Sequence, residues 1–169
     1  MKYFLLILSL STLTFFFYKG LEKDPTLIPS NLIEKKVPDF ELKKTNFFPS
    51  FERSNLFNDK QFKIVNFFAS WCPPCKIEHP NLIKLSEKFK IYGIAKKDDV
   101  NQIYQWLNSS GNPYEAIGLD DDGSTSINWG VYGLPETFIV DDKGKIVHKH
   151  VGPVTKKDLK KINKILKNK

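Results

Sequence analysis

Two kinds of apolar pattern divide this chain. The first is an uncharged run of sixteen residues, Tyr3 to Tyr18, between Lys2 and Lys19. It is shorter than the roughly 20 residues that a helix needs to cross the hydrocarbon layer, but flanking lysines can snorkel and aromatic ends are typical of membrane interfaces. The run is therefore a signal-peptide core or a single-pass anchor. Because no A-x-A-like pair of small residues follows it, we expect an uncleaved membrane anchor over residues 1–19.

The second pattern, beyond residue 36, is that of a folded domain. Residues 20–36 are polar and contain two prolines, which predicts a linker followed by a domain at 37–169. In the domain, short apolar runs rich in β-branched and aromatic residues predict buried strands, and apolar residues three or four positions apart predict helices. The expected strands are residues 63–69, 91–95, 114–119, 136–140 and 145–150, and the expected helices run from the C-x-x-C motif to about residue 89, over 99–109 and beyond Thr155.

The order of these elements indicates an α/β fold. A strand, a helix and a second strand early in the domain imply a right-handed parallel crossover, whereas the last two strands flank the turn 141–144 and predict a hairpin. In the first helix we expect Ile77 among the core residues and a kink at Pro80. Thr155 and Asp158 resemble a capping box at the start of the last helix.

Length, composition and charge narrow the classes of protein. At 169 residues, 41% hydrophobic and 27% charged, the chain has the size and composition of one globular domain. The net charge of +7 comes from the end of the chain, because residues 143–169 hold ten lysines and one acid, whereas the rest holds 16 basic and 18 acidic residues. A nucleic-acid partner is therefore not expected. The lysines fall around a helical pattern and indicate a solvated face, with attraction to anionic lipid headgroups as the alternative.

Both cysteines lie in the run Trp71-Cys72-Pro73-Pro74-Cys75. A bridge at this spacing closes so small a ring that it constrains little chain entropy, which indicates a chemical rather than a structural pair. Cys72 is expected at the amino end of a helix, where unpaired N–H groups and the helix macrodipole favour a thiolate and solvent can reach it. Cys75, one turn later and further inside, is expected to resolve the mixed disulfide that Cys72 forms.

Half of a zinc site is the alternative interpretation of a C-x-x-C pair. His79, His148 and His150 supply enough nominal ligands, since zinc takes cysteine and histidine in tetrahedral sites. A closed site requires four ligands to converge, however, and His79 lies further along the helix whose amino end carries Cys72. A copper- or zinc-binding module therefore ranks below thiol chemistry, and no metal site is expected.

Longer motifs resemble one protein family. The residues WCPPC at 71–75 after a buried strand, with Pro80 five residues later, are similar to thioredoxin. GNPY at 111–114, GVYGLPETF at 130–138 and Glu78-His79 resemble the DsbE/CcmG branch, the membrane-anchored thioredoxin-like proteins of cytochrome c maturation. This resemblance covers the predicted domain. It implies a thioredoxin-like α/β fold, a central mixed sheet flanked by helices, with an N-terminal transmembrane helix.

The resemblance also implies roles for individual residues. Pro135 is the cis-proline that faces the dithiol, the backbone of Leu134 is available to pair with a substrate segment, and Trp71 lines the docking surface. The catalytic residues are Cys72 and Cys75, as a redox-active disulfide. The implied reaction is reduction of the disulfide, or of a mixed disulfide, in the C-x-x-C-H haem-attachment motif of apocytochrome c.

Partners and a location follow from the same resemblance. A transmembrane electron donor of the DsbD/CcdA kind re-reduces the protein, so that no bound cofactor is needed. The domain faces the periplasm from a single-pass anchor in the bacterial inner membrane, which agrees with disulfide chemistry in an oxidising compartment. Within the same fold, a general extracytoplasmic reductase or oxidase of the ResA/TlpA or DsbA kind is the alternative, and the reduction potential separates the two.

One position departs from thioredoxin. Six residues before Cys72, where thioredoxin buries an acid that moves protons to and from the inner cysteine, this chain has Asn66. An amide cannot take that proton. We expect Glu78 or Glu136 to serve instead, because the resemblance places both near the dithiol and a partly buried carboxylate can carry a raised pKa. Solvated carboxylates without that role are the alternative.

Overall fold

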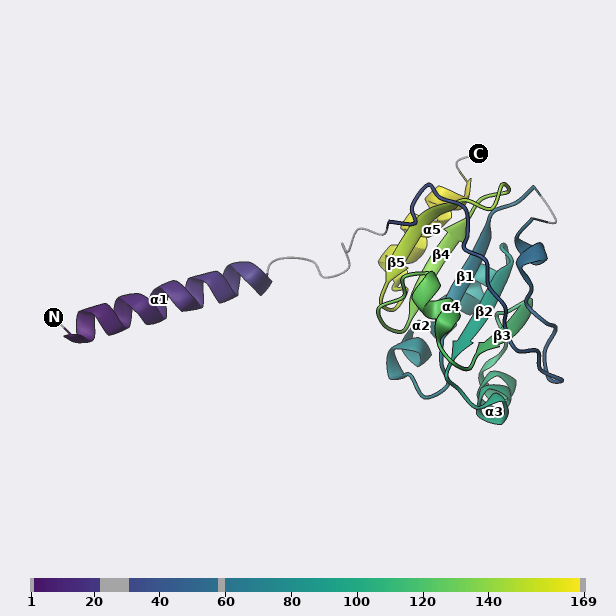
Figure 1. Cartoon of the computed structure of the whole chain (residues 1–169), viewed down its shortest axis with the longest axis horizontal. Helices are drawn as coiled ribbons and strands as arrows, with labels where there is room; N and C mark the ends of the chain where they lie inside the picture. The colour runs from purple at the N-terminus through teal and green to yellow at the C-terminus, as the bar shows by residue number, and fades with distance from the viewer. Residues whose placement is uncertain (1, 22–30, 58–59, 168–169) are drawn as a thin grey trace.

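The computed structural model describes residues 2–21, 31–57 and 60–167 (Figure 1). A single helix precedes an α/β domain. In chain order the elements are α1 (Lys2–Leu21), the short 3-10 helix η1 (Arg53–Leu56), β1 (Lys63–Phe68), α2 (Pro73–Ser86), β2 (Ile91–Lys96), α3 (Val100–Ser110), β3 (Ala116–Asp120), α4 (Ser124–Asn128), β4 (Glu136–Val140), β5 (Ile146–Val151) and α5 (Lys156–Lys167).

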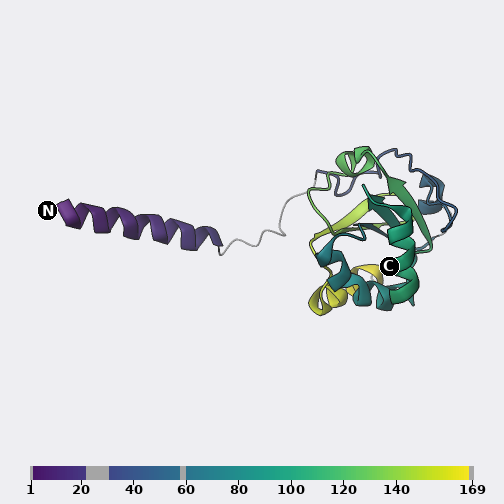
Figure 2. The same ribbon diagram turned by 90° about the horizontal axis from the view of Figure 1, so that it is seen from below.

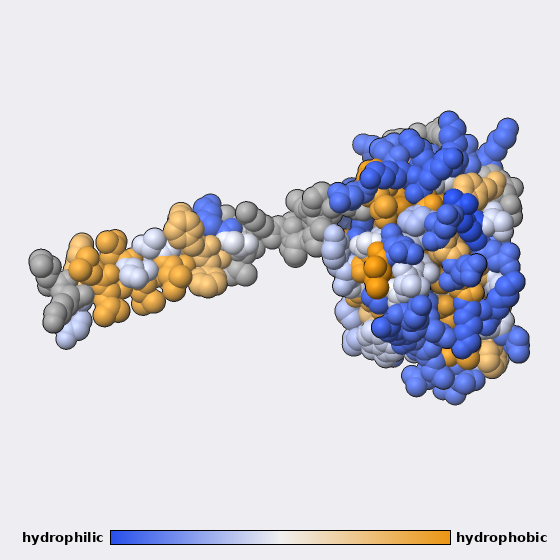
Figure 3. Space-filling view, in the orientation of Figure 1, coloured by the Kyte–Doolittle hydropathy of each residue, from blue (hydrophilic) through white to orange (hydrophobic). Residues whose placement is uncertain are grey.

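The N-terminal helix α1 is longer than the apolar run that predicts it. Its 20 residues rise about 30 Å at 1.5 Å per residue, which is the thickness of a hydrocarbon layer. The window Tyr3–Gly20 is apolar enough to cross a membrane, and its side chains are exposed (Figure 3). The hydroxyls of Thr12 and Thr14 donate to the carbonyls of Leu8 and Leu10, so the helix satisfies these polar groups itself.

The domain is built on one five-stranded sheet in the order β3-β2-β1-β4-β5. β1 is parallel to β2 and β2 to β3, whereas β4 is antiparallel to β1 and β5 to β4, so the sheet is mixed as expected. Lys63 pairs with Val140 at one end of the sheet, and Phe67 pairs with Glu136 at the other. The loop after β1 and the loop before β4 therefore meet at the same end, although 69 positions separate Phe67 from Glu136.

Helices α2, α3 and α5 cover one face of the sheet, and the N-terminal part of the domain with α4 covers the other (Figure 2). Alternation along β1 sends Ile64 and Phe68 to the layer of α2, α3 and α5, and Val65 and Phe67 to the opposite layer. Every residue of β1 is buried. This two-sided burial explains why the sequence of β1 is a nearly continuous apolar run rather than an alternating one.

The predicted strands agree with the structure to within two residues at every end. The predicted capping box is confirmed, because Thr155 donates to Asp158 and the amide of Asp158 donates back to the Thr155 hydroxyl. The expectation that Ile77 belongs to the core is wrong: its side chain is 70% exposed, since α2 turns this residue away from the sheet. The helix continues through Pro80 and ends at Ser86, three residues before the predicted end.

Part of the predicted linker is built into the domain. Of residues 20–36, positions 22–30 lie outside the described residues. The amide of Glu34 donates to the carbonyl of Ile146 at 2.8 Å, and the amide of Ile146 donates to the carbonyl of Lys35 at 2.9 Å. The last residues before the predicted domain therefore pair with the start of β5.

Candidate active site

The two cysteines lie where β1 gives way to α2. Cys72 is the N-cap of α2, and Pro73 and Pro74 occupy the first two helical positions, where a missing backbone N–H costs nothing. Cys72 and Cys75 form a disulfide across Cα atoms 5.3 Å apart, and the amide of Cys75 donates to Sγ of Cys72 at 3.2 Å. The helix end therefore directs an N–H group and its dipole at the Cys72 sulfur, which is the arrangement that stabilises a thiolate when the bridge is reduced.

Cys72 is less accessible than the sequence predicted. Only 3% of the residue is exposed in this disulfide-bonded form, so the expectation of a solvent-exposed sulfur is wrong here. The Cys72 sulfur is bonded to Cys75 and accepts the Cys75 amide, so both contacts hold it against the first turn of α2. A groove of about 300 Å³ reaches it, lined by Trp71, Cys72, Pro73, Pro74, Lys96, Lys97, Gly133 and Leu134. This groove is therefore an opening that leads from the surface to Cys72.

The groove brings together three of the predicted site residues. Trp71 is 56% exposed and forms one wall with Cys72. Leu134 lines the same groove, and the peptide bond between Leu134 and Pro135 is cis. Pro135 is itself buried, and its carbonyl accepts the amide of Gly152 at 3.0 Å. The predicted cis bond is thus confirmed, and it directly follows a residue that lines the groove with Cys72.

The loop between β2 and α3 forms hydrogen bonds with Ser70 and Trp71, the two residues that precede Cys72. The indole N–H of Trp71 donates to the carbonyl of Lys97 at 3.0 Å. The carboxylate of Asp98 accepts both the amide and the hydroxyl of Ser70, the latter at 2.8 Å. Asp99, next to it, instead caps α3 by accepting the amides of Asn101 and Gln102. No sequence pattern indicates that Asp98 anchors the residues in front of Cys72.

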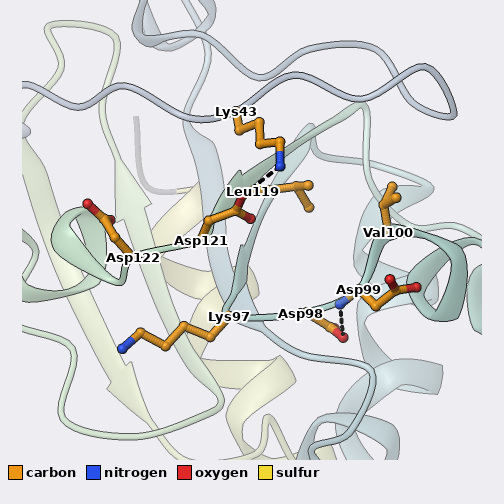
Figure 4. A pocket seen from close by; sticks show the side chains of 8 residues that line it. All are labelled: Lys43, Lys97, Asp98, Asp99, Val100, Leu119, Asp121 and Asp122. Atoms are coloured by element: carbon orange, nitrogen blue, oxygen red, sulfur yellow. Dashed lines mark hydrogen bonds and ion pairs between the residues drawn. The ribbon is translucent and has the colours of Figure 1, made fainter.

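A second pocket, of about 580 Å³, lies behind that loop (Figure 4). Its lining is rich in carboxylates, but most of these already have partners. Asp98 holds Ser70, Asp99 caps α3, and Asp121 forms an ion pair with Lys43 at 2.8 Å. This pocket therefore belongs to the scaffold that fixes the β2–α3 loop.

Glu78 lies on the buried side of α2, one turn after Cys75. Its side chain has no exposed area, and its two oxygens accept the side-chain amide of Asn66 at 2.9 Å and the backbone amide of Val154 at 2.8 Å. Burial raises the pKa of Glu78 to about 7, although the hydrogen bonds from Val154 and Asn66 oppose the rise. A carboxyl group with this pKa can exchange a proton near neutral pH.

Asn66 is the centre of a buried hydrogen-bond network. Its NH₂ group donates to Glu78 and to the hydroxyl of Thr137 at 3.0 Å, and its carbonyl oxygen accepts the hydroxyl of Tyr114 at 2.8 Å. Burial, followed by the charge of Glu78, raises the pKa of Tyr114 well above its usual value, so the phenol remains a donor. Tyr114 belongs to the family motif GNPY, but no sequence pattern connects it with Asn66.

Glu136 does not share this environment. It lies at the start of β4 on the side of the sheet that carries Phe138 and Val140, opposite the layer of α2. Its carboxylate accepts the amide of Tyr132 at 2.8 Å and forms an ion pair with Lys149 at 2.9 Å. The two predicted proton-transfer candidates are therefore separated by the sheet.

The three histidines that were considered as zinc ligands have surroundings other than a metal site. His79 is buried, contacts the ring of Trp106 and is hydrogen-bonded through Nε2 to the carbonyl of Gly111 at 2.9 Å. Burial lowers its pKa, and burial also lowers the pKa of His148 to about 4. His150 lies 3.9 Å from a carboxylate oxygen of Asp158. Among residues 2–21, 31–57 and 60–167, no group of three or more His, Cys, Asp or Glu side chains is arranged to hold a metal ion.

Comparison with known proteins agrees with this geometry. The family model described as Redoxin matches residues 33–166. The DsbE thiol:disulfide interchange protein of Pseudomonas fluorescens biotype C is 42% identical over 140 residues, covering 82% of this chain and 78% of the relative. HelX, a thiol:disulfide interchange protein of Rhodobacter capsulatus, is 39% identical over 147 residues, covering 86% and 83%.

A solved structure agrees on the fold. The thioredoxin domain of a thiol-disulfide oxidoreductase from Bacteroides vulgatus matches with a TM-score of 0.64 at 18% identity, covering 81% of this chain and 99% of that one. At this identity the likeness concerns the fold alone. Fold, family model and curated relatives thus lead to one conclusion: the chain belongs to the redoxin family and, within it, to the DsbE-type thiol:disulfide interchange proteins.

Proposed function

We propose that this chain is a membrane-anchored protein-disulfide reductase that acts on the C-x-x-C-H segment of apocytochrome c during cytochrome c maturation. The chain is a thiol-disulfide oxidoreductase by family. The observation that carries the proposal is the Cys72–Cys75 disulfide at the amino end of α2, which opens onto a groove shared with Leu134 and the cis bond to Pro135. A groove of this kind accepts a polypeptide segment beside the sulfur.

The reaction begins from the reduced dithiol. The thiolate of Cys72 attacks one sulfur of the substrate disulfide; a mixed disulfide forms, the substrate S–S bond breaks, and one substrate thiolate leaves. The thiolate of Cys75 then attacks Sγ of Cys72, so that the Cys72–Cys75 bond forms and the second substrate thiolate leaves. Two electrons pass from protein to substrate, and the protein ends in the disulfide form that the structure describes.

Cys75 must lose its proton before it can attack, and we assign this proton to Glu78. Glu78 lies one helical turn from Cys75, on the same buried side of α2, and its pKa of about 7 suits proton exchange at neutral pH. Glu136, across the sheet and paired with Lys149, is a less suitable acceptor. Trp71 and the backbone of Leu134 hold the substrate segment in the groove.

The anchor and the partners complete the proposal. Helix α1 crosses the bacterial inner membrane once and leaves the domain in the periplasm, where a DsbD/CcdA-type membrane protein returns two electrons to the Cys72–Cys75 disulfide. What supports this part is the length and apolar surface of α1 together with the family of the domain.

Trapping tests the substrate. In the Cys75→Ser variant the resolving thiol is missing, so the mixed disulfide with the substrate should persist and be isolated under non-reducing conditions. The double variant Cys72→Ser/Cys75→Ser is the control and should capture nothing. Capture of apocytochrome c through its C-x-x-C-H cysteines supports the proposal. Capture of many unrelated exported proteins would instead indicate a general reductase, and a reduction potential near −120 mV would indicate an oxidase.

A further inference from the structure

The loop that forms one wall of the groove is fixed from the other side of the sheet. Residues 130–135 form most of the connection between α4 and β4, and Gly133 and Leu134 line the groove beside Cys72. Directly after this loop, Glu136 forms an ion pair of 2.9 Å with Lys149 of β5. Both side chains are almost fully buried, with 0% and 3% of their areas exposed, although lysine and glutamate are normally solvated.

Nearly every other polar contact of this pair goes to the loop. Glu136 accepts the amides of Tyr132 at 2.8 Å and Gly133 at 3.3 Å. Lys149 donates to the carbonyl of Gly130 at 2.7 Å, and its ammonium lies 4.5 Å from the centre of the Tyr132 ring. Three backbone positions of the loop, Gly130, Tyr132 and Gly133, are therefore held by one pair of opposite charges.

We propose that Lys149 is a positioning residue which, through Glu136, holds the loop 130–135 in the conformation that presents Leu134 to an extended polypeptide. This inference rests on the proposed function and deepens it by naming the class of substrate that depends on the loop. The desolvation of two buried charges is expensive, and only good geometry with further hydrogen bonds offsets it. Here those further bonds are the ones that fix the loop.

Small and polypeptide disulfides depend on this loop to different degrees. A small disulfide needs only to reach the sulfur of Cys72 at the helix end. A polypeptide disulfide must also lie along the groove wall and pair with the backbone of Leu134, so its binding requires the loop in one defined conformation. Loosening the loop should therefore lower the ratio of polypeptide to small-disulfide reactivity and raise KM for the polypeptide more than it lowers kcat.

The test compares variants of the full chain in detergent or nanodiscs. Lys149→Met keeps an unbranched side chain, one atom shorter, and removes its charge; Lys149→Arg keeps the charge. The matched control is Lys145→Met, which removes an exposed ion pair of 3.1 Å with Glu34 just before β5, the strand that carries Lys149. The substrates are a peptide with an internal C-x-x-C-H disulfide and oxidised glutathione.

We expect Lys149→Met to lower the ratio of peptide to glutathione reactivity by about tenfold, the effect of one lost charge-assisted hydrogen bond. Lys149→Arg should recover most of the ratio, and Lys145→Met should not change it. Lys149→Met leaves a buried carboxylate unpaired, which can prevent folding. The double variant Lys149→Met/Glu136→Gln removes both charges of the pair and is therefore measured beside it. It should show the same loss of the peptide-to-glutathione ratio. An unchanged ratio in the folded double variant overturns the inference.

Hydrogen exchange separates this inference from the proposed function. If the parent chain reduces neither substrate, the proposed function fails. The positioning role is then decided by the amides of Tyr132 and Gly133, which Glu136 binds. They should exchange at least about tenfold faster in Lys149→Met than in Lys145→Met, because the loss of the pair frees the carboxylate that protects them. Equal exchange in the two variants rejects the role whatever the substrate.

Discussion

The side-chain amide of Asn66 donates a hydrogen bond of 2.9 Å to the carboxylate of Glu78, and both residues are fully buried. This contact places a titratable acid next to a residue that cannot titrate. In our proposal the proton acceptor for the inner cysteine is Glu78, which lies on α2 one turn beyond Cys75, whereas the position on β1 holds Asn66.

The stability of the protein should depend on pH through Glu78. Its folded-state pKa of about 7 lies above the ordinary value of 4.5. The folded state therefore keeps the proton where the unfolded state has lost it. The stabilisation is fully present below about pH 4.5 and is lost as pH rises through 7. The free energy of unfolding should fall by about 3 kcal/mol over this range. Denaturant unfolding of the parent chain and of Glu78→Gln at pH 5 and pH 8 checks this: the parent should lose more stability between the two pH values than the variant does.

The resolving step should also depend on pH through Glu78. In the parent, release of substrate from the mixed disulfide should show an inflection near pH 7, where the buried carboxylate becomes able to accept the proton of Cys75. Glu78→Gln should lose this inflection and slow the step by about 10² to 10⁴ at pH 7, the usual contribution of a positioned base. Glu136→Gln is the comparison and should keep the inflection. Identical profiles in the parent and in Glu78→Gln would reject the assignment.

Tyr114 should set the pKa of Glu78 although it does not contact it. Its hydroxyl occupies the carbonyl oxygen of Asn66 and so directs the NH₂ group toward Glu78. In Tyr114→Phe the amide is free to turn and to offer its oxygen to a protonated Glu78. The inflection of the resolving step should therefore move to higher pH, by up to about one unit for one hydrogen bond of about 1 kcal/mol. A shift to lower pH would contradict this reasoning.

Much of the fold was predictable because it depends on local patterns. The buried strands are apolar runs of β-branched and aromatic residues, and the capping box of Thr155 and Asp158 can be read from four consecutive positions. The dithiol was also predictable, since its chemistry follows from the spacing of Cys72 and Cys75 at a helix start. These features need no knowledge of how distant segments meet.

The remaining features of the site depend on contacts between distant positions. Lys149 appears in the sequence as one more lysine of a basic tail, and only its place beside Phe138 on the covered face of the sheet, within ion-pair distance of Glu136, buries it. Cys72 was expected to be exposed because the sequence cannot show that the loop carrying Leu134 forms the other wall of its groove. Ile77 was expected in the core because its spacing fits a helix, although the spacing does not say which face meets the sheet.

Asp98 and Asp99 should have different effects although they are neighbours. Asp99→Ala removes the cap of α3 and should destabilise the protein by about 1 kcal/mol without changing its reactivity. Asp98→Ala removes the carboxylate that holds the amide and hydroxyl of Ser70, two charge-assisted bonds each contributing about 1.5 to 3 kcal/mol.

Removal of the Asp98 carboxylate should lower the reactivity of the dithiol as well as the stability of the fold. Ser70 immediately precedes Trp71, and the same β2–α3 loop accepts the indole N–H, so releasing Ser70 loosens the wall of the groove next to Cys72. Asp98→Ala should therefore lower kcat/KM for the C-x-x-C-H peptide under conditions where both variants are folded, whereas Asp99→Ala should match the parent. Denaturant unfolding gives the stability of each variant, and peptide reduction measured well below the unfolding midpoint gives the reactivity. Equal reactivity of the two variants would mean that Ser70 and Trp71 are held by the disulfide-bonded turn itself and not by Asp98.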